Sequence, residues 1–146
     1  SILSNEVREK RGLSYSVYSY FLPMRQPGVF MIGLQTKNAR VGEAMDVARN
    51  TLQDYMENVP SEDELLAAKK NITGGFPLRI SSNSKIVGYI SMIGFYDLQH
   101  DYLETFNDKI TAVTVADIRD AFKRRIDPEN LAIVVVGDGQ DELAAR

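Results

Sequence analysis

The alternation of hydrophobic and polar positions predicts an α+β domain in this chain. Residues 2–11 have the pattern of a helix end. Apolar and polar side chains then alternate over residues 14–22 and 29–36, which is the period of β-strands. A connection rich in Pro and Gly joins the two strands as a hairpin. Because only one face of the second strand is cleanly apolar, we expect a sheet covered by helices on one side.

The pattern changes to the helical period after the hairpin. A helix is predicted over residues 41–59, and Pro60 stops it. Ser61 and Glu64 have the spacing of a capping box, which begins a second helix. This second helix should bend or end at a group of helix-breaking residues, namely Gly74, Gly75 and Pro77.

Three further helices are predicted, over residues 84–98, over residues 101–110 and after a capping signature at residues 114–117. The helix over residues 84–98 is apolar almost all round, which is typical of a buried or interfacial helix. The run of β-branched residues from Leu131 to Val136 predicts a central strand buried on both faces. The tail to Arg146 is expected to fray. The element order indicates a mainly antiparallel sheet with helices packed on one face.

Composition narrows the class of protein. A hydrophobic fraction of 44% and a charged fraction of 25% are typical of a globular domain. The net charge of −3 argues against a nucleic-acid partner. The absence of cysteine excludes disulfides, thiolate zinc ligands and thiol nucleophiles. No apolar run approaches the ~20 residues of a membrane span. We expect one domain over residues 1–146, truncated at its N-terminus and part of a longer polypeptide.

The candidate chemistry lies between the first helix and the first strand. Lys10 and Arg11 suit the last turn of a helix, and Gly12 suits the left-handed position that ends it. Arg8 and Tyr15 then lie on two elements on either side of one tight turn. A guanidinium and a phenol in such a place can bind carbonyl oxygens or stabilise a developing oxyanion. The alternative stays open that Arg8 is one of several exposed charges and Tyr15 is a core aromatic.

Other catalytic patterns are missing from the sequence. His100 beside Asp101 is more typical of a surface turn than of a zinc site, which needs three or four ligands. The chain has no Gly-x-Ser-x-Gly turn, and Gly74-Gly75 lacks the Gly-Lys-Ser/Thr ending of a phosphate loop. The sequence therefore predicts no self-sufficient active site.

Residues 7–15 resemble the C-terminal domain of the pitrilysin and insulin-degrading-enzyme superfamily of zinc peptidases, which includes the mitochondrial processing peptidases. The resemblance continues through residues 114–117 and 127–137 and covers essentially the whole chain. Residues 75–79, followed by 94–96, resemble the bacterial two-subunit branch. The fold that the resemblance implies is the LuxS/processing-peptidase-like metallohydrolase fold.

The resemblance also implies a role for the candidate pair. In that superfamily one domain carries an inverted His-x-x-Glu-His zinc motif, and a later domain supplies an Arg and a Tyr seven positions apart. Arg8 and Tyr15 match this spacing and context. They would grip the substrate backbone and help to stabilise the tetrahedral intermediate, so Arg8 and Tyr15 are the expected catalytic residues.

The chain departs from the superfamily in one respect, because it contains no His-x-x-Glu-His motif. We therefore expect it to be inactive alone and to hold no zinc. By resemblance it is the C-terminal, substrate-binding part of a zinc-dependent endopeptidase whose zinc is held by another domain or subunit. The alternatives are a non-catalytic scaffold subunit and a peptide-binding module.

The expected partners follow from the same resemblance. They are a peptide or small-protein substrate and a zinc-bearing N-terminal domain or partner subunit, in a homo- or hetero-oligomer. No nucleic acid and no membrane span are expected. The expected compartment is the bacterial periplasm, with the cytoplasm as the alternative.

Overall fold

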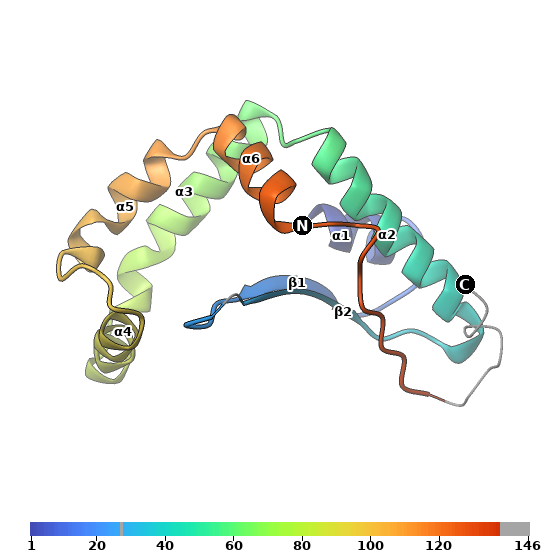
Figure 1. Ribbon diagram of the computed structural model, residues 1–146, viewed down its shortest axis with the longest axis horizontal. Helices are drawn as coiled ribbons and strands as arrows, with labels where there is room; N and C mark the ends of the chain where they lie inside the picture. Colours follow the sequence, from blue (N-terminus) through green and yellow to red (C-terminus); the bar gives the residue numbers. More distant parts are fainter. Residues whose placement is uncertain (27, 138–146) are drawn as a thin grey trace. The chain divides into compact units, whose positions relative to one another are not determined.

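The computed structural model describes residues 1–26 and 28–137. Over these residues the chain forms six α-helices, one π-helix, one 3-10 helix and one β-hairpin (Figure 1). The α+β class is therefore confirmed. The described residues divide into two compact units, the first made of 1–23, 28–58 and 123–137 and the second of 24–26 and 59–122. The predicted fraying of the tail concerns residues 138–146, which lie outside the described residues.

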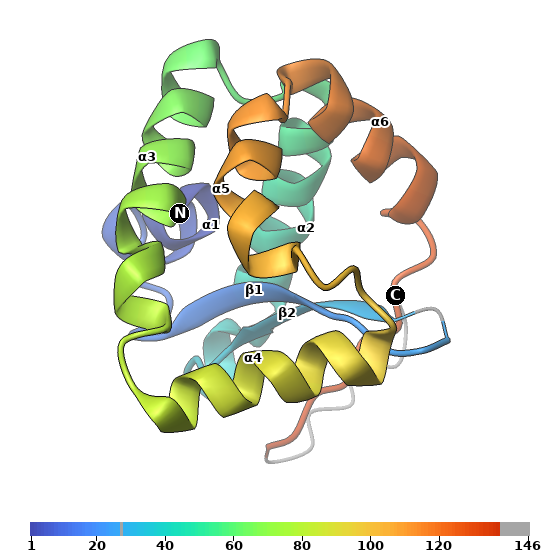
Figure 2. The same cartoon turned by 90° about the vertical axis from the view of Figure 1, so that its left-hand side faces the viewer.

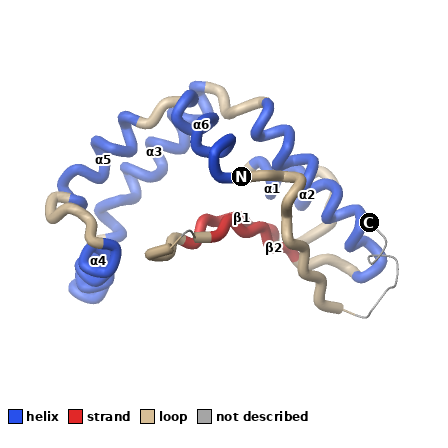
Figure 3. The backbone as a smooth tube through the Cα atoms, in the orientation of Figure 1, coloured by secondary structure: helices blue, strands red, loops and turns tan. Residues whose placement is uncertain are grey.

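The first unit contains the sheet. Helix α1 (Ile2–Ser4) continues into the π-helix η1 (Asn5–Glu9), and the hairpin follows. Strand β1 (Val17–Leu22) pairs antiparallel with strand β2 (Val29–Leu34), so that Val17 lies opposite Leu34 (Figure 3). The predicted alternation in β2 is confirmed, because its even-numbered side chains are the less exposed ones up to residue 32. The antiparallel pairing is confirmed as well.

The core of the first unit lies between its helices and one face of the hairpin. Helix α2 (Val41–Glu57) follows a single 3-10 turn, Asn38–Arg40. Two alanines of α2 face the first helix, and their small side chains allow the two helices to approach closely. The buried core residues are Leu3, Val7, Leu13, Ala44 and Ala48, against which Val17, Ile32, Leu34 and Val47 pack. The helices of this unit therefore cover one face of the hairpin, as the sequence predicts.

The second unit is helical, with α3 (Glu62–Arg79), α4 (Asn83–Tyr96) and α5 (Tyr102–Ala112) (Figure 2). Helix α6 (Val115–Arg125) begins in this unit and ends in the first. Both predicted capping signatures are confirmed. The Ser61 hydroxyl accepts from the Glu64 N–H at 3.2 Å, and the carboxylate of Glu64 accepts from the Ser61 N–H at 2.9 Å. Thr114 and Asp117 form the same pair of bonds at the start of α6.

The prediction that α3 would end or bend near its two glycines is wrong as to its end, because the helix runs through Gly74 and Pro77 to Arg79. Tertiary packing accounts for the difference. Phe76 is buried and stacks on Phe106 of α5, with ring centroids 4.3 Å apart and an interplanar angle of 15°. Packing of this kind outweighs helix propensity. Pro77 lies in the last turn of the helix, which ends two residues later at Arg79.

The prediction of a buried central strand at residues 131–136 is wrong for this chain. These residues are drawn as a loop in Figure 3 and belong to no strand. Their exposure alternates nonetheless, with Val134 and Val136 exposed by 85% and 94% and Ile133 and Val135 by 48% and 43%. The segment is therefore extended, but neither β1 nor β2 pairs with it. A strand requires a neighbour to complete its hydrogen-bond ladder, and the described residues provide none.

Helix α4 carries the largest apolar character and the least burial. None of its residues is buried, and Val87 and Ile90 are exposed by 60% and 59%. Figure 2 shows why, because α4 crosses the ends of α3 and α5 and does not lie along them. A helix of this length is marginal in water without packing. The described residues therefore do not bury α4, in contrast to the predicted alternative of a buried helix.

We expect the chain to self-associate through α4 or to bind a hydrophobic dye. Replacing Val87 and Ile90 together by glutamate should lower both light scattering and dye fluorescence, because it removes exposed apolar area. The fold should survive, since neither side chain is buried. Replacing Ser84 and Ser91 by glutamate adds the same charge to the helix and leaves its apolar side chains intact. A monodisperse wild-type monomer that binds no dye would contradict the prediction.

Candidate functional site

The helix that carries Arg8 ends in a widened turn. In η1 (Asn5–Glu9) the hydrogen bonds reach back five residues, and the Lys10 N–H donates to the Asn5 carbonyl at 2.9 Å. Such π-turns are rare and occur frequently at functional sites. Val7, in the middle of the turn, is fully buried. The backbone at Arg8 is therefore held in place by the buried side chain of the preceding residue, Val7.

Gly12 ends this helix in the left-handed conformation, with φ of 56°. This confirms the prediction from sequence. The conformation lets two consecutive N–H groups turn back onto the helix. The Gly12 N–H donates to the Arg8 carbonyl and the Leu13 N–H to the Val7 carbonyl, each at 2.9 Å. The last carbonyls of the helix are thereby satisfied.

The backbone that follows Tyr15 is fixed by a serine hydroxyl. Ser14 is only 5% exposed, and its Oγ donates to the Ser16 carbonyl at 2.6 Å. The same Oγ accepts from the Ser16 N–H at 3.2 Å. A side chain that bonds the backbone two residues on competes with strand formation. This explains why β1 begins at Val17, so that the predicted start at Ser14 is wrong.

The end of the second strand holds the same turn. The Thr36 hydroxyl donates to the Leu13 carbonyl at 2.7 Å, and the Gln35 N–H donates to the Ser16 carbonyl at 3.4 Å. Both residues lie just after β2, which ends at Leu34 and not at the predicted Thr36. The Leu13 and Ser16 carbonyls are thus bonded to a segment about twenty residues away in the sequence.

Tyr15 itself is 96% exposed. Tyrosine is usually partly buried, so a tyrosine almost wholly in solvent on a fixed turn is unusual. The alternative that Tyr15 is a core aromatic is therefore excluded. The aromatic character of this position does not contribute to the core of the chain.

Arg8 is also exposed, and its Nε lies 3.4 Å from a carboxylate oxygen of Glu9. Exposed ion pairs of this kind contribute little, so the guanidinium can exchange this partner for another. Among the described contacts no hydrogen bond joins Arg8 to Tyr15. The structure thus places the two predicted residues at the two ends of one short segment, both exposed, without direct contact between them.

A charge cluster that the sequence analysis did not identify lies beside Arg8. Glu6 accepts from the Lys10 ammonium at 2.6 Å and from the Arg11 guanidinium at 2.6 Å. These hydrogen bonds, first that from Lys10 and then that from Arg11, lower the pKa of Glu6. The i, i+4 spacing of Glu6 and Lys10 was a readable signal for the first pair. Lys10 and Arg11 are therefore engaged at the helix end.

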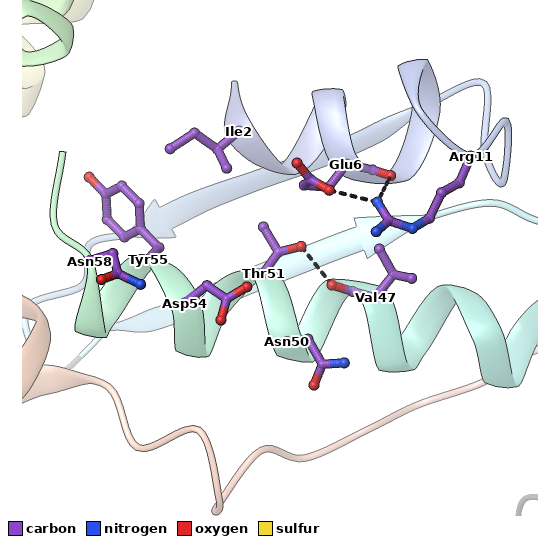
Figure 4. A pocket seen from close by; sticks show the side chains of 9 residues that line it. All are labelled: Ile2, Glu6, Arg11, Val47, Asn50, Thr51, Asp54, Tyr55 and Asn58. Atoms are coloured by element: carbon purple, nitrogen blue, oxygen red, sulfur yellow. Dashed lines mark hydrogen bonds and ion pairs between the residues drawn. The ribbon is translucent and has the colours of Figure 1, made fainter. Parts of the chain in front are cut away.

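A cavity of about 310 Å³ lies between the first helix and α2 (Figure 4). The Glu6–Arg11 pair forms one wall, and one face of α2 forms the other. The lining residues are Ile2, Glu6, Arg11, Val47, Asn50, Thr51, Asp54, Tyr55 and Asn58. Neither Arg8 nor Tyr15 lines it. The cavity and the Tyr15 turn are therefore separate features of the first unit.

The described residues do not suit a zinc ion. No group of three or more His, Cys, Asp or Glu side chains converges among them. Protein zinc sites need three or four such ligands, and His100 is the single histidine of the chain. Nor is any helix in residues 1–26 and 28–137 both long and apolar enough to cross a bilayer.

Over residues 1–26 and 28–137 the chain is an α+β domain whose described side chains form no metal site. Residues 1–72 match the family model described as Peptidase M16 inactive domain. A solved structure of a peptidase M16 inactive domain from Pseudomonas fluorescens is 37% identical, with a TM-score of 0.80 over 88% of this chain and 30% of that one. The chain is therefore similar to peptidase M16 inactive domains, over residues 1–72 in the family model and over 88% of its length in the solved structure.

The curated relatives differ in the activity that their names give. One is an uncharacterized zinc protease of Streptomyces coelicolor, 27% identical over the whole chain and 32% of that protein. Another is a non-peptidase homolog of Helicobacter pylori, 26% identical over 94% of the chain and 32% of that protein. The chain spans about a third of the length of these relatives. These similarities to peptidase M16 and zinc protease sequences agree with the superfamily resemblance seen in the sequence.

Replacing Gly12 by alanine should destabilise the chain by about 1–2 kcal/mol, because a side chain disfavours the left-handed backbone. Open space surrounds Gly12, so the effect reports on the backbone alone. Gly42 of α2 has equally open surroundings, and Gly42→Ala should be neutral or stabilising. Urea unfolding of the three proteins checks this, and equal effects of the two substitutions would contradict it.

The Glu6 cluster should make stability fall on acidification. Because the pKa of Glu6 is lower in the folded state than its ordinary value of 4.5, its contribution is present above that value. It is lost as pH falls through the lowered pKa. The unfolding free energy of Glu6→Gln should therefore depend less steeply on pH below 4.5 than that of wild type.

A Lys10→Gln, Arg11→Gln variant provides the control for this measurement. It removes both donors and should flatten the acid dependence as Glu6→Gln does. An acid dependence equal to wild type in both variants would show that the cluster does not contribute.

Proposed function

We propose that this chain is the substrate-binding C-terminal part of a zinc-dependent endopeptidase of the bacterial two-subunit type. Arg8 and Tyr15 bind the substrate, and the zinc is held by another domain of the polypeptide or by a partner subunit. The bacterial periplasm stays the predicted compartment. The observation that carries the proposal is the near-complete exposure of Tyr15 on a turn whose backbone is bonded on both sides.

The phenol of Tyr15 supplies a hydrogen-bond donor without a partner of its own among the described contacts. In amide hydrolysis, negative charge develops on the oxygen of the scissile carbonyl. A donor aimed at that oxygen stabilises the transition state more than the ground state. Its effect is greatest when the donor need not reorganise, and the fixed turn supports that requirement.

Arg8 supplies the complementary function of substrate binding. Its planar guanidinium carries several donors in fixed geometry, which suits the carbonyl oxygens of an extended peptide backbone. The weak pair with Glu9 leaves most of these donors available. Arg8 therefore acts on substrate affinity as well as on rate, whereas Tyr15 acts mainly on rate.

A second candidate function is a non-catalytic subunit, either a scaffold or a peptide-binding module. The similarity to a non-peptidase homolog favours it. The same exposed Arg8 and Tyr15 would then bind a peptide without its hydrolysis. The presence or absence of an inverted zinc motif in the parent polypeptide or its partner distinguishes the two functions.

Kinetics of the complete protein, with its zinc-bearing domain or partner supplied, test the proposal. Tyr15→Phe should lower kcat on the order of 10²–10³-fold, because it removes one oxyanion donor and keeps the ring. Arg8→Ala should raise KM and lower kcat, and Arg8→Lys should restore only part of the loss, because it lacks the fork. The measurement is steady-state hydrolysis of a quenched fluorescent peptide.

Two matched controls belong to this experiment. Arg49 is exposed on α2, so Arg49→Ala removes a guanidinium elsewhere in the same unit. Tyr20→Phe removes a phenol hydroxyl from β1, where it donates to the Met31 sulfur at 3.2 Å. Both should keep wild-type kinetics. If Tyr15→Phe and Arg8→Ala also keep them while folding normally, the non-catalytic function is the better one.

A further inference from the structure

We propose that Ser14 and Thr36 are positioning residues that fix the backbone at Tyr15 and with it the direction of the Tyr15 Cα–Cβ bond. The inference rests on the proposed function and adds two residues to it. Neither hydroxyl is assigned to substrate, because each is already bonded to the backbone of the turn. Their role is to hold the Leu13 carbonyl, which precedes the Ser14–Tyr15 pair, and the Ser16 N–H and carbonyl, which follow it.

An exposed ring needs such support. Tyr15 is 96% exposed, so almost no side-chain packing restricts where its ring lies. The direction of the Cα–Cβ bond is then set by the backbone alone. A hydroxyl displaced by about 1 Å from its productive place can cost on the order of 10²-fold in rate. The backbone at Tyr15 is thus the element that has to be rigid.

Ser14 fixes the peptide group on the C-terminal side. Its buried Oγ both donates to the Ser16 carbonyl, at 2.6 Å, and accepts from the Ser16 N–H, at 3.2 Å. Without this oxygen, the Ser16 carbonyl retains only the longer bond of 3.4 Å from the Gln35 N–H. The Ser16 N–H would lose its described partner.

Thr36 fixes the other side from a different part of the chain. Its Oγ1 donates to the Leu13 carbonyl at 2.7 Å, across 23 positions of sequence. Leu13 is itself buried in the core next to Val7. The hydroxyl therefore ties the start of the turn to the end of β2, in addition to the packing of Leu13.

The two hydroxyls act on one short segment. One bonds the residue before the Ser14–Tyr15 pair and the other bonds the residue after it. Both bonds are made to the backbone, so neither depends on the chemical nature of the Tyr15 side chain. A positioning role therefore predicts that their removal affects catalysis only while the Tyr15 hydroxyl is present.

The experiment uses the full-length protein with its zinc-bearing part and a quenched fluorescent peptide. Ser14→Ala and Thr36→Val each remove one hydroxyl and should lower kcat about 10- to 100-fold with little change in KM. Thr36→Ser keeps the hydroxyl and should restore most of the rate. Thr73→Val is the matched control, because the Thr73 hydroxyl also donates to a backbone carbonyl, that of Lys69 at 2.9 Å on α3.

A double-mutant cycle separates positioning from general destabilisation. In a Tyr15→Phe background, Ser14→Ala and Thr36→Val should cause no further loss of kcat, because the group they position is already gone. Hydrogen exchange of the peptide covering residues 13–17 supplies a readout independent of activity. It should be at least tenfold faster in Ser14→Ala than in wild type or Thr73→Val.

The outcomes distinguish this inference from the proposed function. If Tyr15→Phe keeps its activity, the proposed function is overturned. If Tyr15→Phe loses activity while Ser14→Ala and Thr36→Val keep it, the positioning role alone is overturned. Unchanged hydrogen exchange in Ser14→Ala also overturns the positioning role. If Ser14→Ala and Thr36→Val lower kcat in the Tyr15→Phe background as much as in wild type, the two hydroxyls stabilise the fold and do not position Tyr15.

Discussion

The burial of Val7 beneath α2 is the contact on which the rest of the candidate site depends. Its side chain is fully buried against a core that includes Ala44, and such burial contributes about 1.5–3 kcal/mol. The Val7 carbonyl accepts from Leu13, and Arg8 is the next residue along the chain. The packing of Val7 in the core therefore determines the residue at which the first helix ends and the residue at which the Tyr15 turn begins. Arg8 and Tyr15 are therefore both carried by backbone that is attached to the same core, although their own side chains are not packed.

The site combines exposed chemical groups with a backbone that has little freedom. Arg8 and Tyr15 are open to solvent, yet the peptide groups near them are bonded to the helix end, to a buried serine and to the end of β2. These peptide groups are therefore ordered when the chain folds, and their ordering adds no entropy cost to the binding of a ligand. The nearby carboxylate of Glu6 is neutralised by two cations, so it does not compete for the Arg8 guanidinium.

Features with a local signal could be predicted from the sequence, and features that need a distant partner could not. The two capping boxes, the hairpin alternation and the left-handed Gly12 depend on residues within a few positions of one another. The stacking of Phe76 that carries α3 past its glycines depends on α5, and a strand at residues 131–136 would depend on a neighbour that the described residues do not supply. Arg8 and Tyr15 were identified through a family resemblance, which says nothing of exposure. The Thr36 bond to Leu13 joins two positions that no local pattern connects.

The first unit is discontinuous along the chain, because residues 59–122 separate its two parts. A hydrogen bond of 2.9 Å from the Gln53 amide to Glu129 joins these parts. The helix, hairpin and α2 of the first part are synthesised before the last part and contain the Tyr15 turn complete. Joining the last part to the first closes the loop of residues 59–122, and this closure costs entropy that contacts between the two parts must offset. The Tyr15 turn therefore depends on contacts within the first part of the chain, whereas the segment around Glu129 packs on that part only once this loop is closed.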